Sequence, residues 1–314
     1  MKQRFFFHIA GVLILLIPAD GWCQQRPLIS NYLYTNLAIN PAYAARQPYT
    51  SFTALYRDQW VNIPGSPKTS SFYAQSGFKD KNMGLGLSVV NENIGVHVSN
   101  SVYASYAYQI NLGNGSRLAM GLQGGFDHIR SDWSRLNLPP GSQHDFLFQG
   151  ETTQLTPNFG TGIFLYSDRF YLGMSIPYML SSRIKSNSDL YTDVRYSRNY
   201  YLTAGIVVDV NEKLVFKPST LIRVEENMPV SLDLNISLFY AETVELGFSY
   251  RHFDSFIGLI GFQVNNYFKF NYAYDLLVSD LNPHSRGSHE LMLQYRINFS
   301  APRKHRMCPG PLYF

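Results

Sequence analysis

The sequence has little charge and no long apolar run beyond its first residues. Only 15% of its 314 residues are Asp, Glu, Lys or Arg, whereas soluble domains contain roughly 25%. The formal net charge of +4 is too small and too dispersed to indicate a protein that binds nucleic acid. After residue 23, no stretch approaches the ~20 apolar residues that a membrane-spanning helix needs. Nucleic acid is therefore not expected as a partner, and a bundle of membrane helices is excluded.

Recognisable catalytic and metal-binding patterns are also missing. The sequence contains no hydrolase elbow, phosphate loop, His-Glu-x-x-His motif or cysteine pair. His128, Ser131 and Asp132 are close in sequence, but closeness in sequence is not the geometry of a catalytic triad. Cys308 lies in a basic tail and is interpreted as an exposed, incidental thiol. The sequence predicts no enzyme activity, no cofactor and no metal site.

The N-terminus has the pattern of a secretory signal peptide. Lys2 and Arg4 precede an apolar run over residues 5–17 that is too short to span a bilayer easily. We predict a signal peptide over residues 1–23, with cleavage after Cys23. Lipidation of Cys23 is the alternative, although the three residues before it match a lipobox poorly. The chain is then exported, and it is a periplasmic protein, a secreted protein or an outer-membrane barrel.

The mature chain is rich in Tyr, Phe and Gly, with 23, 22 and 23 residues. From Tyr49 onward its apolar residues recur at every second position. Side chains of a strand point alternately to its two faces, so this period gives each strand one apolar and one polar face. The clearest segments are residues 230–240, 244–251, 267–276 and 290–299.

The same alternation also fits a soluble β-sandwich, whose apolar faces would form its core. The strands here run about ten residues or more, which is the length a tilted membrane strand needs. Tyr240, Tyr250 and Tyr274 end their apolar faces, as in an interfacial aromatic girdle. The segment Tyr295-x-Ile297-x-Phe299 is similar to the closing strand of an outer-membrane barrel. These observations favour the membrane.

The connections between strands alternate in length. An all-β, transmembrane, antiparallel up-and-down barrel of about fourteen strands is predicted over residues 49–299, followed by a periplasmic tail over 300–314. Short periplasmic turns and longer outer loops are typical of such barrels, and an even strand count leaves both termini in the periplasm. Tight turns are predicted at 79–82, 112–116, 167–168, 211–213, 241–243 and 265–266. The other links are 61–68, 92–97, 130–154, 176–197, 226–229, 252–254 and 278–287, and of these only 226–229 and 252–254 are expected to be short.

If the apolar face meets lipid, the polar face lines the lumen. On the last six strands this face carries five basic and five acidic residues, a balance that favours cross-strand pairing or a polypeptide plug over an ion-selective pore. These candidate lumen charges are Lys217, Arg223, Glu225, Asp233, Glu245, Arg251, Lys269, Asp275, Glu290 and Arg296. The first five strands instead have almost no inward charge, and their inward positions are mainly small: Gly84, Gly86, Ser88, Ser101, Ser105, Gly121 and Gly125. Small residues either leave room for a packed element or relieve crowding in a curved wall.

A short helix precedes the first strand. Asn40 suits the N-cap and Pro41 suits the first helical position, where no amide donor is needed. We predict that residues 24–48 form an ordered periplasmic or lumenal plug segment. A flexible leader is the alternative.

Several motifs together resemble the PorP/SprF family of outer-membrane proteins of the Bacteroidota type IX secretion system. They are Asn-Pro-Ala-Tyr at 40–43, Tyr-Arg-x-Gln-Trp at 56–60 and Pro-Gly-x-Pro-Lys at 64–68, followed by the Gly-Leu-Gly-Leu stretch from residue 84. The candidate interaction or structural residues are accordingly Asn40, Pro41, Tyr43, Tyr56, Arg57, Gln59, Trp60, Pro64, Gly65, Pro67 and Lys68. Ala45 departs from the usual glycine of the first motif, and the tail after Phe299 is more individual.

The resemblance implies a non-enzymatic role in moving proteins through the outer membrane. In one branch the expected partner is the core machine with its periplasmic ring lipoprotein. In the other it is a secreted adhesin, including gliding adhesins. The alternative function is an outer-membrane diffusion channel for small solutes. Arg57 and Lys68, on either side of Trp60, are expected either to anchor an interface or to snorkel beside a girdle tryptophan.

Overall fold

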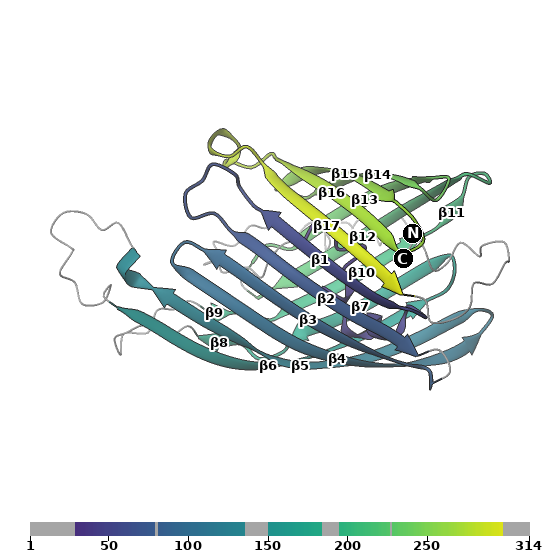
Figure 1. Ribbon diagram of the computed structural model, residues 1–314, viewed down its shortest axis with the longest axis horizontal. Helices are drawn as coiled ribbons and strands as arrows, with labels where there is room; N and C mark the ends of the chain where they lie inside the picture. Colours follow the sequence, from purple (N-terminus) through teal and green to yellow (C-terminus); the bar gives the residue numbers. More distant parts are fainter. Residues whose placement is uncertain (1–28, 79–80, 136–149, 184–194, 227, 298–314) are drawn as a thin grey trace, which may run out of the picture.

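The chain forms one antiparallel sheet that closes on itself (Figure 1). The structure is a computed structural model, and it describes residues 29–78, 81–135, 150–183, 195–226 and 228–297. The predicted signal peptide, the predicted C-terminal tail and Cys308 lie outside these residues. Pairing of β1 with β17 joins the first strand to the last, and pairing of β10 with β12 completes the ring.

Fourteen long strands make up the wall. The sheet has fifteen strands, of which the two-residue β11 (Val208–Asp209) continues β10 beyond Val207. The others are β1 (Thr50–Asp58), β2 (Lys68–Phe78), β3 (Met83–Ile94), β4 (His97–Gly113), β5 (Ser116–Asp132), β6 (Glu151–Tyr166), β7 (Phe170–Tyr178), β10 (Asn199–Ile206), β12 (Leu214–Glu225), β13 (Ser231–Tyr240), β14 (Val244–Arg251), β15 (Ser255–Gln263), β16 (Phe268–Leu277) and β17 (Ser288–Ile297). A separate two-stranded pair, β8 (Ser182–Arg183) and β9 (Arg195–Tyr196), lies between β7 and β10. The predicted barrel of about fourteen strands is confirmed.

The two ends of the barrel differ in their connections. At one end, called here the turn end, β1 begins, β17 ends, and the links between strands have two to four residues. At the other, called here the loop end, lie the links 59–67, 95–96, 133–150, 179–198, 226–230, 252–254 and 278–287. The predicted longer link at 92–97 is wrong, because β3 and β4 pair as far as Ile94 and His97 and leave only a two-residue turn.

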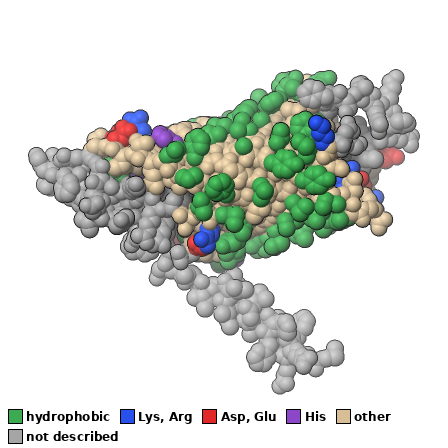
Figure 2. Space-filling model, turned by 90° about the horizontal axis from the view of Figure 1, so that it is seen from below, with side chains coloured by type: hydrophobic (Ala, Val, Ile, Leu, Met, Phe, Trp, Pro, Cys, Tyr) green, Lys and Arg blue, Asp and Glu red, His purple; other side chains and the backbone are tan. Residues whose placement is uncertain are grey.

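The outer face of the wall is apolar and the inner face is polar. Large apolar side chains such as Leu122, Leu155 and Met174 are at least 60% exposed, and no second layer formed by the described residues covers them. Figure 2 shows such side chains spread over the face of the barrel that is in view, with few charged side chains among them. The sandwich interpretation is therefore wrong. Within the described residues, no helix has the length and apolar character needed to cross a membrane.

The interior is filled by the chain itself. Residues 29–49, called here the plug, contain the 3-10 helices η2 (Asn36–Ala38) and η3 (Pro41–Ala45) and lie inside the barrel, where η3 contacts strands β2 to β6 (Figure 1). All plug residues are buried except Ile29 and Ala38, which are half-buried, and Pro48, which is exposed. The plug begins near the loop end and reaches the turn end at Tyr49, directly before β1.

Candidate functional site: the filled lumen

A cluster of ionic side chains holds the first residues of the plug near the loop end. The Arg57 guanidinium contacts Asp275 Oδ2 at 2.6 Å and Glu290 Oε2 at 3.0 Å, and all three side chains are almost fully buried. The backbone amides of Ser30 and Asn31 donate to the Glu290 carboxylate at 2.9 and 2.7 Å. One arginine and two carboxylates from three neighbouring strands therefore fix the plug to the wall.

The cluster extends around the wall through Arg251. Its guanidinium pairs with Asp233 at 3.0 Å on the neighbouring strand and lies 3.6 Å from Asp275. Burying charges is costly unless each is paired and hydrogen-bonded. Arg57 meets this requirement through hydrogen bonds to Asp275 and Glu290, and Arg251 meets it through hydrogen bonds to Asp233. With the longer contact of Arg251 to Asp275, these pairs link β1, β13, β14, β16 and β17 to one another.

A second ionic group lies toward the turn end. Lys269 contacts Glu245 Oε2 at 3.0 Å, and its ammonium lies 3.5 Å from the centroid of the Tyr34 ring. The Lys217 ammonium lies 5.8 Å from the same ring. A cation over an aromatic face is attracted by the negative centre of the ring, more strongly where water is excluded. Tyr34 thereby attaches the plug to β12 and β16.

Asn40 fixes the middle of the plug to the opposite wall. Its Oδ1 accepts a hydrogen bond from the Ala42 amide at 2.9 Å and caps η3, as predicted, with Pro41 at the first helical position. Its Nδ2 donates to the carbonyl of Ile163 in β6 at 3.0 Å. The side chain therefore accepts a hydrogen bond from the first turn of the helix and donates one to the barrel wall, and an alanine could make neither.

Tyr43 carries the apolar contact of this region. Its ring packs edge-on against Phe164 with centroids 5.5 Å apart, and Phe164 stacks on Tyr171 at 5.6 Å. The Arg46 guanidinium lies 4.5 Å from the Tyr166 centroid. Phe164 points inward although it belongs to a strand with an apolar outer face. Together with Tyr171 it forms a small aromatic core inside the barrel, and Tyr43 of the plug packs against this core.

Glycines in the wall make room for the plug. A Cβ on Gly84 would overlap the backbone of Ala44, and a Cβ on Gly121 would overlap the backbone between Pro41 and Ala42. A Cβ on Gly86 would press on the Leu37 side chain. The interpretation of these small residues as space for a packed element is therefore correct for these three positions. Gly125 differs, because its Cβ would meet Val102 and Tyr103 of the adjacent strand.

All ten predicted lumen charges are buried. The expectation that the first strands carry almost no inward charge is wrong, since Arg57, Glu92 and Asp127 point inward. Within the described part of the chain, the buried charges comprise seven basic and seven acidic side chains. They are Arg46, Arg57, Lys217, Arg223, Arg251, Lys269 and Arg296, and Glu92, Asp127, Glu225, Asp233, Glu245, Asp275 and Glu290.

The remaining motif residues lie at the loop end. Tyr56 faces outward and is 44% exposed. The Gln59 side chain is buried and accepts from Arg57 Nε at 3.5 Å, while the Trp60 amide donates to Ser288 Oγ at 3.1 Å. Pro67 is buried, whereas Pro64 and Gly65 are exposed on the loop 59–67 and Lys68 is exposed at the start of β2.

The sequence-based expectation that Arg57 and Lys68 anchor an interface on either side of Trp60 is therefore wrong for Arg57, because its side chain points into the lumen. Among the described residues, the one ionic contact of Lys68 is a long, exposed contact of 3.6 Å with Asp58. The plug anchors Ser30 and Asn31 were not identified from the sequence at all. Neither residue belongs to an alternating segment or a recognised motif.

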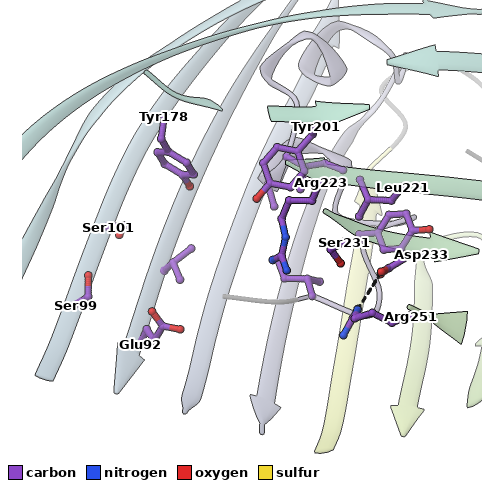
Figure 3. Close-up of a pocket in the computed structure, with 15 residues that line it drawn as sticks. Glu92, Ser99, Ser101, Tyr178, Tyr201, Leu221, Arg223, Ser231, Asp233 and Arg251 are labelled. Carbon is purple, nitrogen blue, oxygen red and sulfur yellow. Dashed lines mark hydrogen bonds and ion pairs between the residues drawn. The ribbon is translucent and has the colours of Figure 1, made fainter. Parts of the chain in front are cut away.

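A cavity of about 60 Å³ remains in the lumen near the loop end (Figure 3). Ile29, Tyr32 and Ile39 of the plug form one side, and polar side chains of the wall form the other. It leaves room for about four water molecules. Among the described residues, no group of three or more His, Cys, Asp or Glu side chains has the arrangement of a metal site.

A family model described as "Type IX secretion system membrane protein PorP/SprF" matches residues 23–295. Solved structures with similar folds include the CymD monoaromatic hydrocarbon channel, at 11% identity and a TM-score of 0.48, covering 85% of this chain and 93% of that one. A FadL homologue from Pseudomonas aeruginosa has 13% identity and a TM-score of 0.45, covering 91% and 95%. No curated protein matches the chain at a significant level.

Proposed function

The chain belongs to the PorP/SprF family of type IX secretion system membrane proteins, and we propose that it supports the export or surface attachment of secreted proteins. In this proposal the secreted proteins do not pass through its own lumen. It acts as a closed, non-enzymatic outer-membrane barrel that presents surfaces to other secretion components.

The observation that carries this proposal is the filled lumen. The plug is tied to the wall by the hydrogen bonds of Ser30 and Asn31 to Glu290 and of Ser30 to Asp275. The contact of Lys269 with the Tyr34 ring and the Asn40 hydrogen bond to β6 hold it at two further places. These contacts come from opposite parts of the barrel, so no side of the plug is free to swing away without breaking buried polar contacts. The remaining cavity of about 60 Å³ is far too small to hold an extended polypeptide that crosses the barrel.

Partners must then be met at the two ends or on the outer face. At the loop end, Pro64 and Gly65 of the loop 59–67 and Lys68 at the start of β2 are exposed. At the turn end, the short turns face the periplasm in the predicted orientation. A periplasmic ring lipoprotein would meet the turn end. A secreted adhesin awaiting attachment would meet the loop end, which suits a role in gliding motility.

A deletion strain examined by surface proteomics tests the proposal. We expect secreted proteins to disappear from the cell surface and to accumulate in the periplasm, and complementation with the wild-type chain to restore them. Loss of one adhesin alone would assign the chain to the adhesin branch. Loss of many cargo proteins would assign it to the core machine, and an unchanged surface proteome would contradict the proposal.

The diffusion channel remains the alternative function. Planar-bilayer recordings of the purified barrel separate the two, because a plugged lumen gives no steady conductance whereas a solute channel does. Steady open-channel currents from the intact protein would favour the channel.

A further inference from the structure

The cavity near the loop end is lined by a buried cation, Arg223, that has no partner among the described residues. Arg223 lies on β12, two residues before the strand ends, and its side chain is only 9% exposed. Within the described residues, its guanidinium makes no ion pair or hydrogen bond. Figure 3 shows it reaching into the cavity between Tyr201 and Ser231, which flank it on the neighbouring strands.

Arg223 differs in this respect from the arginines around it. Arg57 and Arg251 each contact at least two carboxylates. Asp233 also lines the cavity, but it is engaged by Arg251 through three hydrogen bonds of 3.0 to 3.1 Å. An arginine stays charged at any physiological pH, and a buried unpaired charge is costly. The site therefore favours an anion from outside the described chain.

We infer that this cavity is a binding site for a carboxylate, with Arg223 as its principal ligand. A guanidinium offers two parallel N–H donors that match the two oxygens of a carboxylate. The cavity holds about four water molecules, which is the size of a carboxylate with a short stem. Glu92 and Asp233 in the same lining disfavour a dianion, since a second negative charge would lie close to theirs.

Access to the site is from the loop end. The wall residues that line the cavity all lie close to the loop-end termini of their strands: Glu92 near the end of β3, Arg223 near the end of β12 and Asp233 near the start of β13. The plug closes the other side through Ile29 and Tyr32. The carboxylate belongs either to a small free anion or to a polypeptide terminus or acidic side chain.

Binding to the purified full-length protein in detergent tests the inference. The probes are acetate, a short peptide with a free C-terminal carboxylate and the same peptide as its amide. Arg223→Gln removes the charge at similar length, Arg223→Lys retains it without the planar fork, and Arg130→Gln changes an exposed arginine at the same end. Heat-dependent gel mobility establishes that each variant is a folded barrel.

We expect the free-acid peptide to bind about tenfold or more tightly than the amide, and Arg223→Gln to abolish this preference. Arg223→Lys should retain part of it, and Arg130→Gln all of it. Displacement of the peptide by millimolar acetate indicates a site for any carboxylate, whereas no displacement indicates a polypeptide ligand. Equal binding of acid and amide, no binding of either carboxylate, or unchanged binding to Arg223→Gln would overturn the inference. The assay does not depend on secretion, so its failure leaves the proposed function standing.

Discussion

Arg57 and Asp275 form a 2.6 Å ion pair across 218 residues of sequence, and together they contact the plug. Arg57 lies on β1 and Asp275 on β16, with β17 between them. Ser30 Oγ lies 2.9 Å from both Asp275 oxygens and accepts from Arg57 Nη1 at 2.9 Å. This relationship joins the closing seam of the barrel to the start of the plug, so barrel closure and plug docking depend on the same charges.

Arg57→Ala should therefore destabilise the barrel strongly. It leaves Asp275 and Glu290 buried with one fewer cation, and breaking a buried ion pair costs about 3–5 kcal/mol. The measurement is the urea dependence of unfolding in detergent. Lys68→Ala is the matched control, since Lys68 is 54% exposed and its contact with Asp58 is long; its effect should stay within about 0.5 kcal/mol. Similar losses for both variants would show that the Arg57 cluster has no special role.

The sequence predicted the wall much better than the contacts inside it. Alternation placed Lys217, Asp233 and Glu290 on the inner face, because every second residue of a strand shares that face whatever it touches. The same alternation applies to β1, where Arg57 lies an even number of residues after Ser51 and Thr53 and therefore on the same inner face. The proximity of Trp60 instead suggested an interface, so the inward position of Arg57 was missed although the signal was present.

The plug contacts could not be predicted, because they depend on three-dimensional register. Ser30 meets Glu290 only because β1 pairs with β17 in the observed register and the plug returns toward the loop end. Asn40 illustrates the division. Its capping of η3 is local and was predictable, whereas its hydrogen bond to Ile163, 123 residues away, was not. The two-residue turn at 95–96, where a longer link was expected, is likewise set by the pairing of β3 with β4.

The wall glycines give a second prediction. Gly84→Ala should displace the plug or destabilise the barrel by about 1–3 kcal/mol, because its Cβ would overlap the Ala44 backbone, which cannot move as a flexible side chain can. Gly258→Ala is the control, since a Cβ there meets no atom within 4 Å. Urea unfolding compares the two. Equal stability of both variants would contradict close packing of the plug against β3.

Replacing the plug should open the barrel. Substitution of residues 31–45 by a Gly/Ser linker removes Asn40, Tyr43 and Tyr34 while leaving the wall intact. We expect steady single-channel currents from this variant in planar bilayers and none from the wild-type protein. Its heat-dependent gel mobility must match that of the wild type, which shows that the barrel still closes. A variant that has the wild-type gel mobility but conducts no steady current would contradict the assignment of residues 29–49 as the segment that blocks the lumen.

The orientation of the barrel is tested by thiol labelling of intact cells. In a Cys308→Ser background, cysteine is placed at Pro64 on the first loop or at Glu212 on a short turn, both of them exposed. Short turns face the periplasm in barrels of this kind, so a membrane-impermeant maleimide should label Pro64→Cys on intact cells. It should label Glu212→Cys only after the outer membrane is permeabilised. The reverse pattern would place the loop end, and with it Arg223 and the Ser30 anchor, on the periplasmic side, and an adhesin could then no longer be expected to meet that end.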